Sequence, residues 1–222
     1  MLLKEIRTLI LQETTIEWRL KYAINGILLY LISVIFISYL SFRSQVSSLN
    51  PVIWNTLFWI IILFTAVNAV TKSFIQLNRG RLIYYYSIAN PTAIILSKVI
   101  YNALLLIGIG LTGLFIYSLV LGNPIDDMML FIVNLLLGSV GFAGVLTMNS
   151  GIASKAANST TLMAILSFPV ILPLLLIIIR ISKNALEGLD WSASYGPITY
   201  LCAIDIIVIT ISTILFPYIW RS

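Results

Sequence analysis

Six long apolar stretches constrain the fold of this chain more than any other feature of its sequence. A helix needs about 20 predominantly apolar residues to cross the hydrocarbon core of a bilayer. We place these stretches at 22–40, 51–71, 92–121, 128–148, 160–179 and 197–220. The chain is 60% hydrophobic and 9% charged, whereas soluble domains are about 25% charged. Because the connections are short, the sequence predicts an all-α polytopic membrane protein in which residues 1–222 form a single transmembrane domain.

The 13 lysines and arginines are divided unevenly between the two ends of the predicted spans. If the N-terminus is cytoplasmic, ten of them lie on the inner side: Lys4, Arg7, Arg19, Lys21, Lys72, Arg79, Arg81, Lys98, Lys155 and Arg221. The outer side receives three, which are Arg43, Arg180 and Lys183. Basic residues accumulate on the cytoplasmic side of membrane proteins. An even number of spans then places both termini in the cytoplasm.

Composition also excludes several classes of function. The net charge of +5 is scattered among apolar stretches, so no basic surface for nucleic acid is predicted. Histidine is absent, which excludes imidazole acid–base catalysis and histidine ligation of haem by this chain. The sequence has no phosphate-binding loop and no paired carboxylates within a span. We therefore expect no enzymatic activity and no metal or cofactor bound by this chain.

The N-terminal segment, residues 1–21, has the pattern of an amphipathic helix. One arc of its helical wheel is apolar and consists of Leu2, Leu3, Ile6, Leu9, Ile10, Ile16 and Leu20. Such a helix lies in the plane of the membrane interface, with its cationic residues near anionic lipid. Glu13 falls inside this arc, so the pattern predicts an interruption of the helix there. A simple membrane anchor and an elbow helix that braces a permease against its neighbours both remain open.

The longest inner connection, residues 72–91, combines basic and aromatic side chains. It contains Phe74, Arg79, Gly80, Arg81, Tyr84, Tyr85 and Pro91. Gly80 permits a turn with positive φ, which other residues resist. Pro91 ends any helix that precedes the third span. One interpretation is a segment that orients the chain through its charges and interfacial aromatic residues. The other is a short coupling helix that presses into a groove on a soluble ATPase.

Four features lie within the predicted spans. Gly138, Gly141 and Gly144 line the fourth span and favour close helix packing. Pro169 and Pro173 are four residues apart in the fifth span, so they predict a kink and freed carbonyls that need protein or water partners. Asp205 lies deep in the sixth span and is a candidate site, although a neutral carboxyl bonded to a neighbouring helix is an equal alternative. Lys98, near a span end, can extend its amine to the surface.

Several runs of sequence resemble the CcmB family. They are 54–64 (WNTLFWIIILF), Arg79-Gly80-Arg81, 95–102 (ILSKVIYN), 135–138 (LLLG), Gly151-Ile-Ala-Ser-Lys155 and 167–173 (SFPVILP). The opening 17–26 and the closing 216–221 look like the Bacteroidetes-type branch. Family members often carry acidic residues around the loop glycine, whereas this loop has Gln76, Arg79 and Arg81. If the family's acidic residues contact the ATPase, that contact uses other chemistry here.

The resemblance implies the permease subunit of an ABC-type haem exporter in cytochrome c maturation, with the ABC-2-like fold, in the bacterial inner membrane. It implies a CcmA-like ATPase that binds ATP, CcmC-, CcmD- and CcmE-like partners, two copies of this chain, and haem as the substrate of the complex. Gly151 and Lys155 would belong to a second inner loop. An ABC-2-like exporter of lipid, glycan or drug is the alternative, because the same architecture would serve it.

Overall fold

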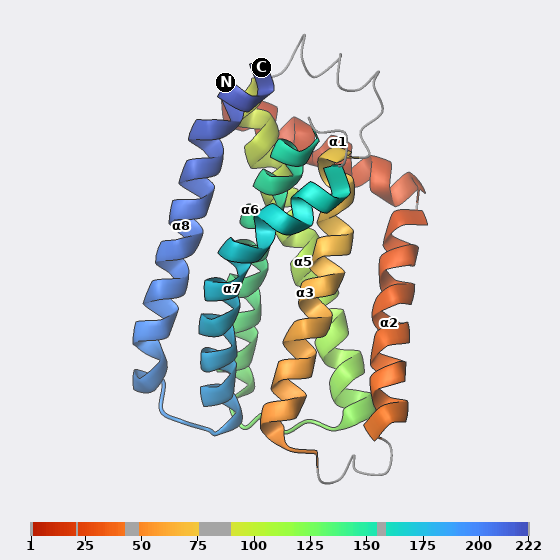
Figure 1. The fold of residues 1–222 in the computed structure, drawn as a ribbon, viewed down its shortest axis with the longest axis vertical. Coiled ribbons are helices and arrows are strands. Elements are labelled where there is room, and N and C mark those ends of the chain that lie inside the picture. Colours follow the sequence, from red (N-terminus) through yellow and green to blue (C-terminus); the bar gives the residue numbers. More distant parts are fainter. Residues whose placement is uncertain (1, 21, 43–48, 76–89, 155–158, 222) are drawn as a thin grey trace.

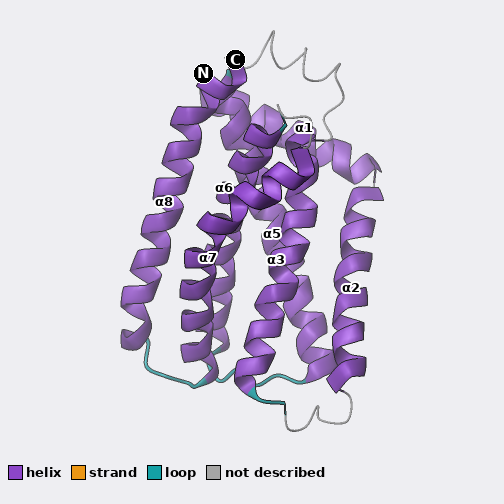
Figure 2. Cartoon of the chain, in the orientation of Figure 1, coloured by secondary structure: helices purple, strands orange, loops and turns teal. Residues whose placement is uncertain are grey.

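The computed structural model describes residues 2–20, 22–42, 49–75, 90–154 and 159–221, and its regular secondary structure there is entirely α-helical (Figure 2). The helices are α1 (Leu2–Leu20), α2 (Tyr22–Phe42), α3 (Pro51–Ile75), α5 (Pro91–Leu121), α6 (Met128–Ala153), α7 (Ser159–Leu186) and α8 (Ser192–Arg221). Six of these described helices, α2 to α8, are long and apolar enough to cross a membrane. The prediction of an all-α polytopic membrane protein is confirmed.

Three of the predicted span boundaries are wrong, and two of them lie at the same connection. The fourth span was predicted to end at residue 148, but α6 continues to Ala153. The fifth span was predicted to end at residue 179, but α7 continues to Leu186. The sixth was predicted to begin at residue 197, but α8 begins at Ser192. Arg180 and Lys183 end the apolar run without ending the helix, because their side chains are exposed and the backbone hydrogen bonding continues. Gly188, with φ of 61°, lies in the short turn that remains.

The spans form one bundle, and α1 lies across one of its ends (Figure 1). The beginning of α1 and the end of α8 are both found at this end, which we call the termini end. The connections 122–127 and 187–191 lie at the other end, which we call the opposite end. The two described ends of the chain therefore lie on one side of the bundle, as an even number of spans requires.

Helix α6 occupies the centre of the bundle. It contacts α3, α5, α7 and α8, and 67% of its span is buried, against 17% for α2 at the edge. Toward the opposite end, buried aromatic rings from three helices pack together: Trp54, Phe58 and Trp59 of α3, Tyr117 of α5, and Phe131 and Phe142 of α6. Such ring pairs add to the free energy gained from their buried area, so this cluster joins α3, α5 and α6.

Helix α7 changes direction along its length (Figure 1). Its first part runs obliquely across the bundle, and its last part runs alongside the neighbouring spans. The helix contains Pro169 and Pro173. Proline removes a backbone donor and is a common cause of such bends.

Candidate functional site

The predicted coupling segment is described only at its two edges. Phe74 lies in the last turn of α3, with its side chain outside the described part of the structure. Pro91 is the first residue of α5. The other predicted residues of this segment lie outside the described residues: Arg79, Gly80, Arg81, Tyr84 and Tyr85.

The start of α5 is fixed by polar contacts. The Asn90 side chain accepts a hydrogen bond from the Thr92 backbone N–H at 3.0 Å, and so caps the helix. Pro91 is the first helical residue, a position whose backbone N–H has no partner within the helix, so the N–H that proline lacks is not missed. The Asn90 backbone N–H donates to Glu5 Oε1 at 2.7 Å. The N-terminal helix therefore contacts the point at which the chain re-enters the membrane domain.

Glu13 and Lys98 form an ion pair between α1 and α5. The distance between Glu13 Oε1 and Lys98 Nζ is 2.9 Å, and the two side chains are 12% and 3% exposed. Two predictions are thereby corrected. The helix α1 is uninterrupted from Leu2 to Leu20, because Glu13 faces a cation rather than lipid. Lys98 does not extend to the surface, because its partner lies beside it.

The apolar arc of α1 is buried partly against protein. Ile6 and Leu9 are 7% and 8% exposed and join a cluster with residues of α5 and with Phe216 and Trp220 of α8. Leu3, in contrast, is 82% exposed. The helix α1 is therefore docked on the bundle through the middle of its apolar face.

The glycines of α6 and Asp205 of α8, which the sequence presented as separate features, meet in the bundle. A Cβ atom added at Gly141 would lie 2.5 Å from Asp205 Oδ1 and 2.6 Å from Leu174 Cδ1. A Cβ added at Gly144 would lie 3.1 Å from Val208, and one at Gly138 would lie 2.8 Å from Ile178. The glycine row therefore provides the close approach of α7 and α8 to α6.

Asp205 is buried at this three-helix junction. Its side chain is 5% exposed, and neither carboxyl oxygen has a hydrogen-bond partner among the described residues. The alternative of a carboxyl bonded to a neighbouring helix is therefore not what the structure contains. In the described part of the chain, no three histidine, cysteine, aspartate or glutamate side chains come together as metal ligands.

The other predicted residues lie apart from this junction. Pro169 and Pro173 are exposed on the outer face of α7. Gly151 was predicted to lie in a second inner loop, but it is buried in the last turn of α6, because the helix continues to Ala153. Its carbonyl accepts from Ser154 Oγ at 2.7 Å. Lys155 lies outside the described residues.

Sequence reasoning did not find the polar contacts that join the spans near the termini end. Asn102 Nδ2 of α5 donates to Thr147 Oγ1 of α6 at 2.8 Å. Asn149 Nδ2 of α6 donates to Ser167 Oγ of α7 at 3.0 Å. Such side chains bond across helices where lipid offers no partner. An asparagine inside an apolar run is the only sequence signal for them, and it does not name the partner.

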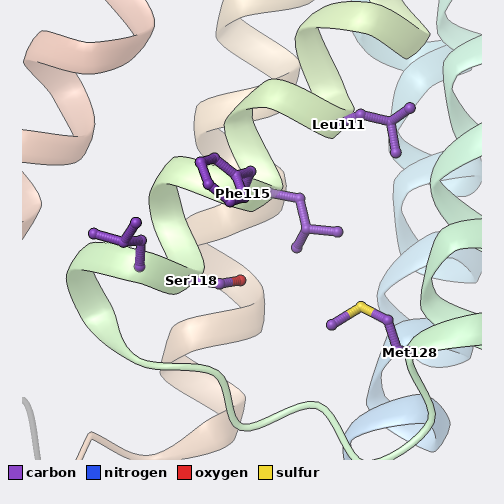
Figure 3. Close-up of a pocket in the computed structure, with 6 residues that line it drawn as sticks. Leu111, Phe115, Ser118 and Met128 are labelled. Carbon is purple, nitrogen blue, oxygen red and sulfur yellow. The ribbon is translucent and has the colours of Figure 1, made fainter.

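An apolar pocket of about 420 Å³ opens between α5 and α6 near the opposite end (Figure 3). Its lining is almost entirely apolar and consists of Leu111, Leu114, Phe115, Ser118, Leu119 and Met128. The Ser118 Oγ atom is buried without a hydrogen-bond partner. The lining contains no titratable or nucleophilic pair, so this pocket supports no reaction.

Comparison with known proteins places these features in a family. The model of the family described as CcmB protein matches residues 4–221, which is nearly the whole chain. A search of curated proteins finds no match. The family match extends from the docked N-terminal helix to the last span, so it covers both the Glu13–Lys98 pair and the junction at Gly141.

Proposed function

The chain belongs to the CcmB family, and we propose that it is the permease subunit of an ABC-type haem exporter in cytochrome c maturation. The observation that carries this proposal is the match over residues 4–221. The six span-length helices supply the membrane domain that a permease requires. The proposed site of the complex is the bacterial inner membrane, with both termini in the cytoplasm, as the distribution of basic residues favours.

In this proposal the chain has no catalytic site of its own. ATP would be hydrolysed by a CcmA-like partner, because the sequence contains no phosphate-binding loop. Two copies of this chain would assemble with that ATPase and with CcmC-, CcmD- and CcmE-like proteins. Residues 72–91 would contact the ATPase, and the connection that follows α6 and contains Lys155 would lie on the same side of the membrane.

The role proposed for this chain is mechanical rather than haem-ligating. Histidine is absent from the sequence, and histidine is the commonest protein ligand of haem iron in globins and peroxidases. The purified chain, mixed with haem and washed, is therefore expected to show no Soret band. A stoichiometric band that depends on a methionine or tyrosine would contradict this role.

The deciding experiment uses a bacterium whose own copy of this subunit has been deleted. The expected result is that the wild-type chain restores covalent haem in c-type cytochromes and co-purifies with both the ATPase and the haem chaperone. Co-purification with an ATPase, but with no haem chaperone and no restored cytochrome, would instead indicate an exporter of lipid, glycan or drug. Insertion in the membrane with no ATPase partner would overturn the permease assignment.

A further inference from the structure

Three acidic side chains of α1 contact α5 or the residue that caps it, in the same order along both segments. Glu5 accepts from the Asn90 backbone N–H at 2.7 Å. Two turns further along, Glu13 accepts from Lys98 Nζ at 2.9 Å. Both contacts join residues that are 85 positions apart in the sequence, so α1 and α5 run in the same direction and in constant register here.

A third contact continues the series. Glu17 and Tyr101 form a side-chain hydrogen bond. Glu17 lies one turn beyond Glu13 on α1 and on the same face, because residues four apart on a helix are neighbours. We call the set of acids that face α5 the acidic ladder: Glu5, Glu13 and Glu17.

The central contact of the ladder is buried. The Lys98 side chain is 3% exposed and that of Glu13 is 12% exposed. A second described ion pair, Lys183 with Glu187 at the opposite end, is longer at 3.6 Å, and its side chains are 53% and 49% exposed. Removing one partner of a buried pair leaves an uncompensated charge, whereas an exposed pair exchanges its partner for water. The Glu13–Lys98 contact therefore constrains where α1 can lie.

Polar and apolar contacts act together at this end of the bundle. Ile6 and Leu9 of α1 pack in the cluster that includes Phe216 and Trp220 at the end of α8. The apolar cluster holds α1 on the bundle but tolerates sliding, because apolar contact is not directional. The ladder supplies directional contacts at two points in α5 and at a third, Asn90, which caps the helix. Three such points prevent both sliding and rotation of one helix against the other.

We propose that the acidic ladder makes α1 and the first turns of α5 one rigid unit, and that Glu13 and Lys98 are positioning residues for coupling ATP hydrolysis to haem export. This inference rests on the proposed function. Its physical basis is the Glu5 contact to Asn90, the residue that precedes α5. A displacement applied where α5 begins would move α1 and α5 together, and would not be lost in relative motion of the two helices.

The test is a charge exchange in the complete complex. The variants are Glu13→Gln, Glu13→Lys, Lys98→Glu and the double exchange Glu13→Lys/Lys98→Glu. Glu187→Gln, which breaks the exposed pair, is the matched control. Three quantities are measured in the same membranes: the amount of this chain, ATP hydrolysis by the co-purified complex, and covalent haem in c-type cytochromes.

Each single exchange is expected to lower haem attachment per copy of the chain about ten-fold or more while ATP hydrolysis continues, because Glu13→Lys and Lys98→Glu each place two like charges opposite one another, and their repulsion moves α1 from its register. Glu13→Gln keeps a hydrogen-bonding group opposite Lys98, so it should insert normally and show the same direction of change. The double exchange restores the opposite charges and should recover most of the haem attachment. The control should resemble the wild type.

Two outcomes would overturn the inference. Full haem attachment in all the single variants would show that the register of α1 does not matter for coupling. A parallel loss of chain, ATP hydrolysis and haem attachment, including in Glu13→Gln, would show that the pair only supports folding. If the wild-type chain itself supports no haem attachment, the proposed function is wrong. The wild type is measured first, so this outcome is distinguished from a failure of the inference about the pair.

Discussion

Glu13 and Lys98 are charged residues at positions where the surrounding pattern predicts apolar ones. Glu13 lies in the apolar arc of α1, and Lys98 lies within the span of α5. Each is unfavourable alone, because burying an unpaired charge is costly. The attraction across their 2.9 Å contact offsets that cost. A residue that violates the local pattern is thus explained by a second violation 85 positions away.

Gly141 allows a direct prediction at the same scale. Replacing Gly141 with alanine should destabilise the protein by about 1–3 kcal/mol, the usual range for overpacking a filled core. The added Cβ would meet Asp205 Oδ1 at 2.5 Å and Leu174 Cδ1 at 2.6 Å. The measurement is the midpoint of thermal unfolding in detergent.

Gly108 is the matched control for this substitution. It lies within the α5 span, and a Cβ added there meets nothing within 4 Å. Gly108→Ala should therefore leave the midpoint unchanged or raise it, since alanine is favoured over glycine in a helix by about 1 kcal/mol. Equal midpoints for the two variants would contradict this prediction, because they would mean that the junction of α6, α7 and α8 has space for the added methyl group.

At the scale of elements, α1 differs from its sequence-based prediction more than any span does. Its pattern predicts a helix in the plane of the membrane interface, interrupted at Glu13. The helix instead packs Ile6 and Leu9 against α5 and α8 and directs its acids toward α5. The amphipathic pattern specifies that one face must be covered, but it does not specify whether lipid or protein covers it. The elbow-helix interpretation agrees better with this docking than a simple anchor does.

The bend of α7 leads to a second prediction. Pro169 and Pro173 are expected to be static parts of the architecture rather than a flexing point. The double variant Pro169→Ala/Pro173→Ala should straighten α7 and lower the thermal midpoint, because the oblique first part of the helix carries Ser167, which bonds Asn149 at 3.0 Å. Normal haem attachment per copy in the surviving protein would support the static role. A raised midpoint with lost haem attachment would contradict it.

A third prediction concerns the proposed coupling segment. Gly80→Val, or Phe74→Ala, should leave insertion near normal but weaken ATPase association and abolish cytochrome c maturation. Valine restricts the backbone far more than glycine does, and Phe74 would supply the apolar contact with the ATPase. Co-purified ATPase and covalent haem are measured in the same cells.

A control distinguishes the segment from other apolar sites on the chain. Leu29 is 71% exposed on α2, so Leu29→Ala should change neither quantity. If Gly80→Val and Phe74→Ala also keep full ATPase binding and full maturation, residues 72–91 only orient the chain and the coupling assignment is wrong.

At the scale of the whole molecule, the topology is open to cysteine labelling after Cys202→Ser removes the single cysteine. Ser192→Cys reports the opposite end and Thr8→Cys the termini end, and both positions are exposed. With cytoplasmic termini, Ser192→Cys should react with an impermeant maleimide in intact cells, and Thr8→Cys only after permeabilisation. The reverse pattern would invert the orientation. Ser150 is unsuitable as a reporter because it is 0% exposed.

The sequence by itself determined the number of spans, the helical class and the family. These properties depend on local composition: about 20 apolar residues in succession can satisfy their backbone only as a helix when lipid surrounds them. The composition also excluded histidine-based catalysis and histidine ligation of haem by this chain, because no fold can supply a residue that the sequence lacks. The end of α7 and the start of α8 were predicted less well, because a helix extends beyond its apolar run wherever its polar side chains reach water.

Only the tertiary structure decided which residues meet. Asp205 and Gly141 are far apart in the sequence and belong to different predicted features, yet they are in direct contact across α6 and α8. Glu13 was predicted to break its helix and Lys98 to reach the surface, and instead they form a pair. The pattern of apolar residues along one helix predicts which face must be buried. It does not record which neighbour buries that face, because the neighbour is chosen by packing among all the helices at once.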